Sequence, residues 1–224
     1  MEEGIIQVFM EYWPIFLRGA AGTLEYAFIA VFFGSILGIL VALMRISRVG
    51  WLSKAAAVYA NVLRGTPLLV QMYIAYYFLP MAIPALNVMS RSFCVLLSLS
   101  LNSSAYVSEI IRGGLMALDP GQAEAGRSLG LNYVDTMRFI VIPQAFKAIL
   151  PALGNEFIIL LKDTSLITVI GGKELVYAAQ AIYGRTYEQM FPLIGIACIY
   201  LLLVMIFSWL LSILERRLRQ SDRR

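Results

Sequence analysis

Charged and amide side chains recur within the long apolar stretches of this sequence, at positions where exposure to lipid would be costly. Arg64, Asn102, Glu109 and Glu156 lie inside such stretches, and Asp163 lies at the end of one. A charge near the centre of a bilayer costs at least about 2.5–3.5 kcal/mol on insertion scales, so it faces other helices or water and often marks a solute pathway. Opposite charges at this depth could bind the ammonium and carboxylate groups of a small zwitterion.

The composition places these groups in a membrane protein and argues against several kinds of catalysis. Hydrophobic residues make up 60% of the 224-residue chain and charged residues 14%, against roughly 45–50% and about 25% in a soluble domain. The chain contains no histidine, the most frequent general base and metal ligand. Its two cysteines, Cys94 and Cys198, stand far apart in apolar runs. We therefore expect neither a metal site nor a catalytic residue.

Five stretches are long and apolar enough to cross a bilayer, which takes about 20 mostly apolar residues. No stretch between them is long enough to fold alone, so residues 1–224 are expected to form a single transmembrane domain. The predicted fold class is an all-α integral membrane protein. Its five transmembrane helices are expected at Ala20–Met44, Ala55–Leu79, Phe93–Ile111, Gln144–Leu161 and Met190–Leu214.

The distribution of basic residues predicts the orientation. Of the 18 Lys and Arg residues, 12 lie in loop 45–54, stretch 112–147 and the basic tail 215–224, and 5 lie on the opposite side. Basic residues concentrate on the cytoplasmic side of membrane proteins, so the C-terminus is expected inside and the N-terminus outside. Residues 1–19 carry acidic and amide side chains at helical spacing among apolar ones, which predicts a short helix in the outer interface.

The second predicted span is interrupted at Arg64-Gly65-Thr66-Pro67. Glycine and proline free backbone polar groups there, as in the broken helices of transporters. Arg64 lies nine residues beyond Ala55, which is about 14 Å along a helix. Two interpretations remain open. Arg64 and the opened backbone around Thr66 could bind a substrate carboxylate, or Arg64 could pair with an acidic residue of another span.

The third span carries a polar stripe. Ser98, Asn102, Tyr106 and Glu109 follow one another at steps of four, four and three residues and share one helix face. Within a bilayer, such a stripe faces other helices or a cavity rather than lipid. Glu109 could also form a local pair with Arg112.

The fourth span contributes two further acidic residues. Glu156 and Asp163 are seven residues apart and share a helix face. Glu156 has no charged neighbour within one helical turn, whereas Asp163 stands beside Lys162 and could instead be a cap or a local pair. We expect Glu156 to contact the cationic group of a solute, with Asp163 beside it.

Segment 119–142 predicts a short helix–turn–helix on the cytoplasmic side. Asp119 is a good N-cap and Pro120 suits the first helical position. Gly130 suits the turn after the first helix because glycine accepts the left-handed conformation. A second helical stretch follows before Pro143 opens the fourth span. Such a projection is either a connector or a docking element for a cytoplasmic partner.

This segment resembles the EAA signature of ABC importer permeases, which is Glu-Ala-Ala, three residues, Gly, nine residues, Ile, one residue and Leu-Pro. Gly126 stands for the second Ala and Ile142 for the Leu, while every spacing agrees. Other polar motifs resemble the polar amino-acid permease branch of that family. The residues concerned are Glu124-Ala125-Gly126, Gly130, Ile140, Ile142-Pro143, Arg64-Gly65-Thr66-Pro67, Gln71, Ala105-Tyr106, Glu109, Arg112-Gly113-Gly114, Gly154-Asn155-Glu156 and 162–166.

The resemblance implies specific partners. Glu124 and Ala125 would contact a cytoplasmic ATP-binding subunit, present in two copies, with Gly126 in the same coupling segment and Gly130 in the turn behind them. The chain has no glycine-rich phosphate loop followed by Lys and Ser or Thr, so ATP and Mg are expected on that partner and no cofactor on this chain. The resemblance also implies a second permease copy in a homodimer, an extracytoplasmic solute-binding protein, and a bacterial or archaeal-type cytoplasmic (inner) membrane.

The function expected is ATP-driven import of a polar amino acid. The intramembrane and boundary acids outnumber the bases, which favours a cationic substrate such as arginine or lysine. An ion-coupled secondary amino-acid transporter or channel subunit is an alternative that would need no docking helix, and a membrane anchor is another. The expected substrate-binding residues are Arg64, Thr66, Gln71, Asn102, Tyr106, Glu109, Glu156 and Asp163.

Overall fold

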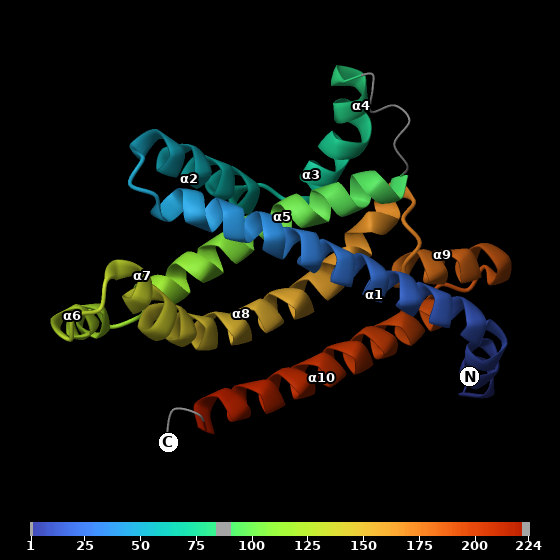
Figure 1. The fold of residues 1–224 in the computed structure, drawn as a ribbon. Coiled ribbons are helices and arrows are strands. Elements are labelled where there is room, and N and C mark those ends of the chain that lie inside the picture. Colours follow the sequence, from blue (N-terminus) through green and yellow to red (C-terminus); the bar gives the residue numbers. More distant parts are fainter. Residues whose placement is uncertain (1, 84–90, 221–224) are drawn as a thin grey trace.

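A computed structural model describes residues 2–83 and 91–220, and the elements in that part of the chain are helical (Figure 1). The elements are α1 (Glu2–Ile46), α2 (Gly50–Gly65), α3 (Leu68–Tyr73), η1 (Ile74–Phe78), α4 (Leu79–Ala82), α5 (Arg91–Met116), α6 (Pro120–Ser128), α7 (Tyr133–Thr136), η3 (Met137–Val141), α8 (Ile142–Asp163), η4 (Thr164–Ile170), α9 (Leu175–Thr186) and α10 (Met190–Gln220).

Four helical stretches of the described residues are long and apolar enough to cross a membrane. They contain α1, α5, α8 and α10; in Figure 1 the last three run in a similar direction and α1 crosses them. These are the first, third, fourth and fifth of the predicted spans. The number of five crossings and the orientation remain predictions. The four stretches are Met10–Ile46, Ser92–Met116, Tyr133–Ile170 and Met190–Leu218.

The second predicted span, Ala55–Leu79, is divided rather than continuous. Helix α2 ends at Gly65, and Thr66 and Pro67 have extended backbone with ψ of 147° and 134°. A residue before proline is disfavoured in the helical region and proline has no N–H to donate, so the helix stops at the interruption that the sequence predicted. A second apolar stretch, Leu68–Ala82, then starts in a new direction (Figure 1).

The N-terminal segment is helical, as expected, but it is continuous with the first predicted span; its position in the membrane interface remains a prediction. Helix α1 continues from Glu2 to Ile46 with Pro14 inside it. Its first turns bend away from the rest of the helix in Figure 1. Proline removes one intrahelical hydrogen bond and kinks a helix, and here it redirects α1 without ending it.

Helix α5 lies at the centre of the bundle and packs against α1, α2 and α8. Its contact with α1 is close because small residues face it. A Cβ built on Gly34 would lie 2.8 Å from the Ser103 Cβ, and one built on Gly38 would lie 2.6 Å from Val107 Cγ1. Small residues at such crossings let helix backbones approach within a membrane. The polar stripe of α5 is thereby held in a fixed register against α1.

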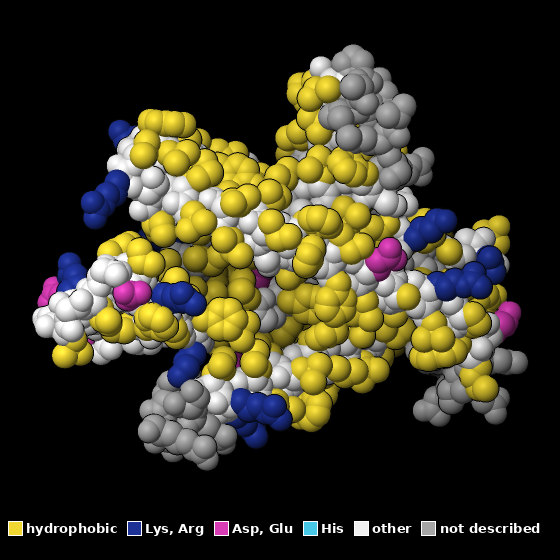
Figure 2. Space-filling view, viewed as in Figure 1, with side chains coloured by type: hydrophobic (Ala, Val, Ile, Leu, Met, Phe, Trp, Pro, Cys, Tyr) yellow, Lys and Arg dark blue, Asp and Glu magenta, His cyan; other side chains and the backbone are white. Residues whose placement is uncertain are grey.

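The surface matches a protein that crosses a bilayer. Apolar side chains cover most of the face seen in Figure 2, whereas Lys and Arg gather toward the two ends. On α10, Leu201 and Trp209 are 60% and 62% exposed. Large apolar side chains exposed along a helix of this length fit contact with lipid.

Candidate functional site

The break between α2 and α3 is held together by amide side chains. Gln71 donates from Nε2 to the carbonyl of Leu63 (2.7 Å), to that of Thr66 (3.1 Å) and to Thr66 Oγ1 (2.9 Å). Asn102 on α5 donates from Nδ2 to Gln71 Oε1 (3.0 Å). The predicted site residues Thr66, Gln71 and Asn102 therefore meet, and they satisfy backbone carbonyls that the end of α2 leaves open.

Arg64, Tyr106 and Glu109 meet next to this break. The Arg64 guanidinium carbon lies 5.4 Å from the centre of the Tyr106 ring, and Arg64 Nη1 lies 3.5 Å from Glu109 Oε2. The structure therefore shows the second of the two interpretations of Arg64, an ion pair with an acid on another helix. Because a guanidinium has five N–H donors, this contact leaves it able to bind a further group.

Glu109 is the centre of a larger charge cluster. It forms the expected local pair with Arg112, whose Nε donates to Oε1 at 3.1 Å, and a further ion pair with Arg45 in the last turn of α1. Arg45 comes from a helix far away in the sequence and was not anticipated as a site residue. Its involvement follows from the close crossing of α1 and α5.

Glu156 is buried in α8, with 5% of its surface exposed. Among the described residues, its carboxylate has neither a hydrogen-bond partner nor an ion pair. The charges that act on it are those of Asp163 and Arg64. Asp163 ends α8 and is half-buried, and its side chain caps no backbone N–H of the following turn. A buried carboxylate without a direct partner is costly and marks a candidate binding group.

Helix α6 is the short projecting helix that the sequence predicted (Figure 1), and its place on the cytoplasmic side remains a prediction. Asp119 caps it by accepting from the backbone N–H two residues further on, at 2.9 Å. Glu124 and Ala125 are exposed on its surface. Gly130 ends the turn with φ of +87°, a conformation that glycine adopts without a Cβ penalty.

Gly126 is buried although it lies in the exposed motif. A Cβ built there would lie 2.7 Å from Ile140 Cδ1 and 3.3 Å from Thr136 Cγ2. The departure from alanine at this position therefore fits the tight packing of α6 on the following helical segment. A hydrogen bond from Gln144 Nε2 to Gln122 Oε1 (3.2 Å) also ties α6 to α8. Motion of α6 would be transmitted directly to the fourth predicted span.

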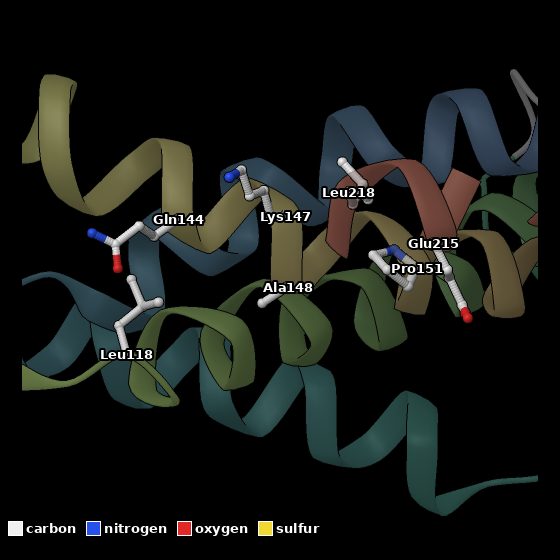
Figure 3. A pocket seen from close by; sticks show the side chains of 7 residues that line it. All are labelled: Leu118, Gln144, Lys147, Ala148, Pro151, Glu215 and Leu218. Atoms are coloured by element: carbon white, nitrogen blue, oxygen red, sulfur yellow. The ribbon is translucent and has the colours of Figure 1, made fainter. Parts of the chain in front are cut away.

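A cavity of about 470 Å³ lies beside this junction. Figure 3 shows that its lining comes from the segment before α6 and from α8 and α10. None of the expected substrate-binding residues lines this cavity, so it is separate from the Arg64 and Glu156 groups. The lining residues are Leu118, Gln144, Lys147, Ala148, Pro151, Glu215 and Leu218.

A buried polar group missed from the sequence is Glu174, which is fully buried and caps α9. Its carboxylate accepts from the N–H groups of Val176 (2.7 Å) and Tyr177 (2.8 Å) and from the Tyr200 hydroxyl (2.8 Å). Burial raises the pKa of Glu174 above its ordinary value, and these hydrogen bonds oppose the shift. The signal in the sequence for this cap was the position of Glu174 directly before the apolar residues of α9. Glutamate is not a usual N-cap residue, so it went unnoticed.

In the described part of the chain, no three His, Cys, Asp or Glu side chains gather as a potential metal site. The candidate site residues are charged, amide and hydroxyl side chains, arranged around a helix break and along one face of α8.

Comparisons with known proteins show the family of the chain. The family model described as binding-protein-dependent transport system inner membrane component matches residues 34–220. A putative glutamine transport system permease protein of Rickettsia bellii is 40% identical over 202 residues, which cover 90% of this chain and 92% of the relative. The arginine transport system permease protein of Bacillus subtilis is 40% identical over 209 residues, covering 93% and 94%.

A solved structure extends the likeness to three dimensions. A chain of the crystal structure of an amino acid ABC transporter with histidines is 44% identical, with a TM-score of 0.89, and the match covers 93% of this chain and 96% of that one. These matches favour an ABC permease over an ion-coupled transporter. The chain belongs to the family of binding-protein-dependent transport system inner membrane components and is a multi-pass inner-membrane permease subunit of an ABC importer for amino acids.

Proposed function

We propose that this permease subunit imports cationic amino acids of the arginine and lysine type and works as one half of a homodimer. The observation that carries the proposal is Glu156, a buried carboxylate without a direct partner among the described residues. A cationic ligand group would stabilise that carboxylate, because a buried charge needs an opposite charge or hydrogen bonds.

The balance of charges near Glu156 supports a cation over a neutral side chain. Glu109 is already paired with several arginines, so it does not count toward free negative charge. Glu156 and Asp163 remain, with Arg64 acting on Glu156 and the neighbouring Lys162 acting on Asp163. Of these four side chains Glu156 alone is buried, so it is the charge that most needs a partner. A cationic amino acid carries a second positive group that glutamine lacks, and that group could pair with Glu156.

The residues at the helix break are proposed to border the same site. Thr66, Gln71 and Asn102 fix the end of α2 and so present Arg64, while Tyr106 provides the ring over which its guanidinium lies. In this role they hold the carboxylate-binding group at a fixed place. A preorganised guanidinium loses less entropy when it binds a ligand.

Helix α6 is proposed as the contact with an ATP-binding subunit. Glu124 and Ala125 are exposed there, and Leu129 at its end is 84% exposed. A mixed acidic and apolar surface of this kind fits a docking element better than a solvated connector. Two such subunits, together with an extracytoplasmic binding protein that delivers the amino acid, complete the proposed importer.

Uptake by proteoliposomes tests the substrate class. The permease is reconstituted with its ATP-binding subunit and binding protein, and uptake of labelled arginine and glutamine is compared for the wild type and Glu156→Gln. We expect the substitution to lower arginine uptake about tenfold or more, equivalent to about 1.4 kcal/mol, and to affect glutamine far less. Glu25→Gln, an exposed acid of α1, is the matched control. Equal uptake of arginine and glutamine by both the wild type and Glu156→Gln would contradict the cationic assignment.

A further inference from the structure

Three arginines converge on the single carboxylate of Glu109. They come from the last turn of α1 (Arg45), the last turn of α2 (Arg64) and α5 itself (Arg112). Three positive charges and one negative charge leave this partly buried cluster with two uncompensated positive charges. An excess of charge at a partly buried place attracts an anionic ligand group.

The three contacts are unequal. Arg112 binds Glu109 through both Nε and Nη2, and Arg45 shares Oε2 with Arg64. Arg64 makes the longest contact, at 3.5 Å, and its side chain is the most exposed of the three, at 36% against 13% for Arg45. Arg64 can therefore leave while Glu109 stays neutralised by the other two. An exposed ion pair of this kind contributes little stability, because water screens the two charges.

The charge of Arg64 also affects the proposed substrate site. It is the positive charge that acts on Glu156, while its guanidinium lies over Tyr106. One guanidinium thus contacts a carboxylate of the protein, Glu109, and also exerts its charge on Glu156, the acid proposed to bind a cationic group of the substrate. A substrate whose cationic groups contact Glu156 would bring its α-carboxylate toward this same guanidinium.

We propose that Glu109 is an internal competitor for the substrate α-carboxylate, which holds Arg64 when the site is empty and releases it when an amino acid binds. The inference rests on the proposed function in one respect, that the substrate is held between Glu156 and Arg64. Glu109 is a positioning residue that acts through Arg64 and does not touch the substrate.

The competition should weaken the binding of a ligand that carries a carboxylate. The apparent dissociation constant equals the intrinsic one divided by the fraction of Arg64 that is free, so any group that occupies Arg64 weakens binding of a carboxylate ligand. A ligand without a carboxylate is insensitive to this fraction. The α-amide of arginine, argininamide, keeps both positive groups and lacks the carboxylate, so it is the matched probe.

Direct binding to the purified permease–ATPase complex, without binding protein, tests the proposal by calorimetry with arginine and argininamide. The quantity compared is the ratio of the argininamide to the arginine dissociation constant. We expect Glu109→Gln to raise this ratio about threefold or more, in line with the release of a half-exposed ion pair. Arg64→Met should bring the ratio close to one, and adding Glu109→Gln to Arg64→Met should then change nothing.

Two further variants keep the outcome decisive. Glu109→Asp keeps a carboxylate for Arg45 and Arg112 but shortens its reach to Arg64, so it should raise the ratio in the same direction if Glu109→Gln fails to fold. Glu25→Gln should leave the ratio unchanged. An unaltered ratio in Glu109→Asp and Glu109→Gln, or an equal rise in the Arg64→Met background, would overturn the proposal.

Failure of the proposed function gives a different result. If the wild type binds glutamine and not arginine, the cationic assignment fails, and the same ratio is measured with glutamine and its α-amide. Glu109 competition is then upheld by a raised ratio in Glu109→Gln and refuted by an unchanged one.

Discussion

Replacement of Gly22 by alanine should weaken the attachment of α9 to α1. A Cβ at Gly22 would lie 2.1 Å from the backbone oxygen of Lys173, next to the buried cap of α9. That oxygen cannot turn aside as the end of a side chain could. Overpacking costs about 1–3 kcal/mol, here at the upper end, and alanine returns about 0.5–1 kcal/mol of helix propensity, so we expect a net loss of about 2 kcal/mol.

Gly184, inside α9, provides the matched control because a Cβ there meets no heavy atom within 4 Å. Thermal unfolding of the detergent-solubilised complex measures both variants. At about 2–4 °C per kcal/mol for a chain of this size, Gly22→Ala should lower the midpoint by about 4–8 °C and Gly184→Ala should raise it slightly. Equal midpoints for the two variants would refute the argument from close packing.

Three further substitutions test the break between α2 and α3, the turn at Gly130 and the buried cap at Glu174. Gln71→Leu removes its hydrogen bonds at the end of α2 and leaves Asn102 with only its longer contact to the Leu63 carbonyl (3.4 Å), so we expect a loss of about 1–3 kcal/mol in unfolding free energy, and an unchanged midpoint would count against it. Gly130→Ala forces a side chain into a φ of +87° and should cost about 1–2 kcal/mol and reduce co-purification of the ATP-binding subunit, whereas Gly113→Ala should not. Burial raises the pKa of Glu174, so the unfolded protein loses this proton at a lower pH than the folded one, and stability falls as pH rises from about 4.3 through the raised pKa. Glu174→Gln should therefore flatten the dependence of the unfolding midpoint on pH above about 4.3. Parallel curves for the wild type and the variant would contradict this.

The helical spans could be predicted because apolar length is a strong signal in lipid. The end of α2 at Gly65 was also predictable, since proline at position 67 disfavours the helical conformation of the residue before it, next to a glycine. The continuity of α1 from Glu2 was not. An amphipathic start and an apolar continuation differ in composition, but the backbone hydrogen-bond pattern runs through both, and Pro14 bends the helix without ending it.

The sequence predicted which residues belong to the site better than it predicted which residues they contact. The face shared by Asn102 and Glu109 follows from helical spacing, and so does the local pair of Glu109 with Arg112. The pair with Arg45 could not be foreseen because it depends on how α1 crosses α5. Arg64 left two interpretations open for the same reason, since the identity of its partner is a property of packing between helices.

The most direct test of the account is ATP-driven uptake of labelled arginine by proteoliposomes that contain the permease, its ATP-binding subunit and its binding protein. A double substitution at the exposed residues of α6, Glu124→Arg with Ala125→Asp, should abolish uptake while the permease remains folded and inserted. Uptake in the wild type should require ATP and should be indifferent to an imposed ion gradient. Uptake that survives the double substitution, or that an ion gradient drives without the ATP-binding subunit, would contradict the account.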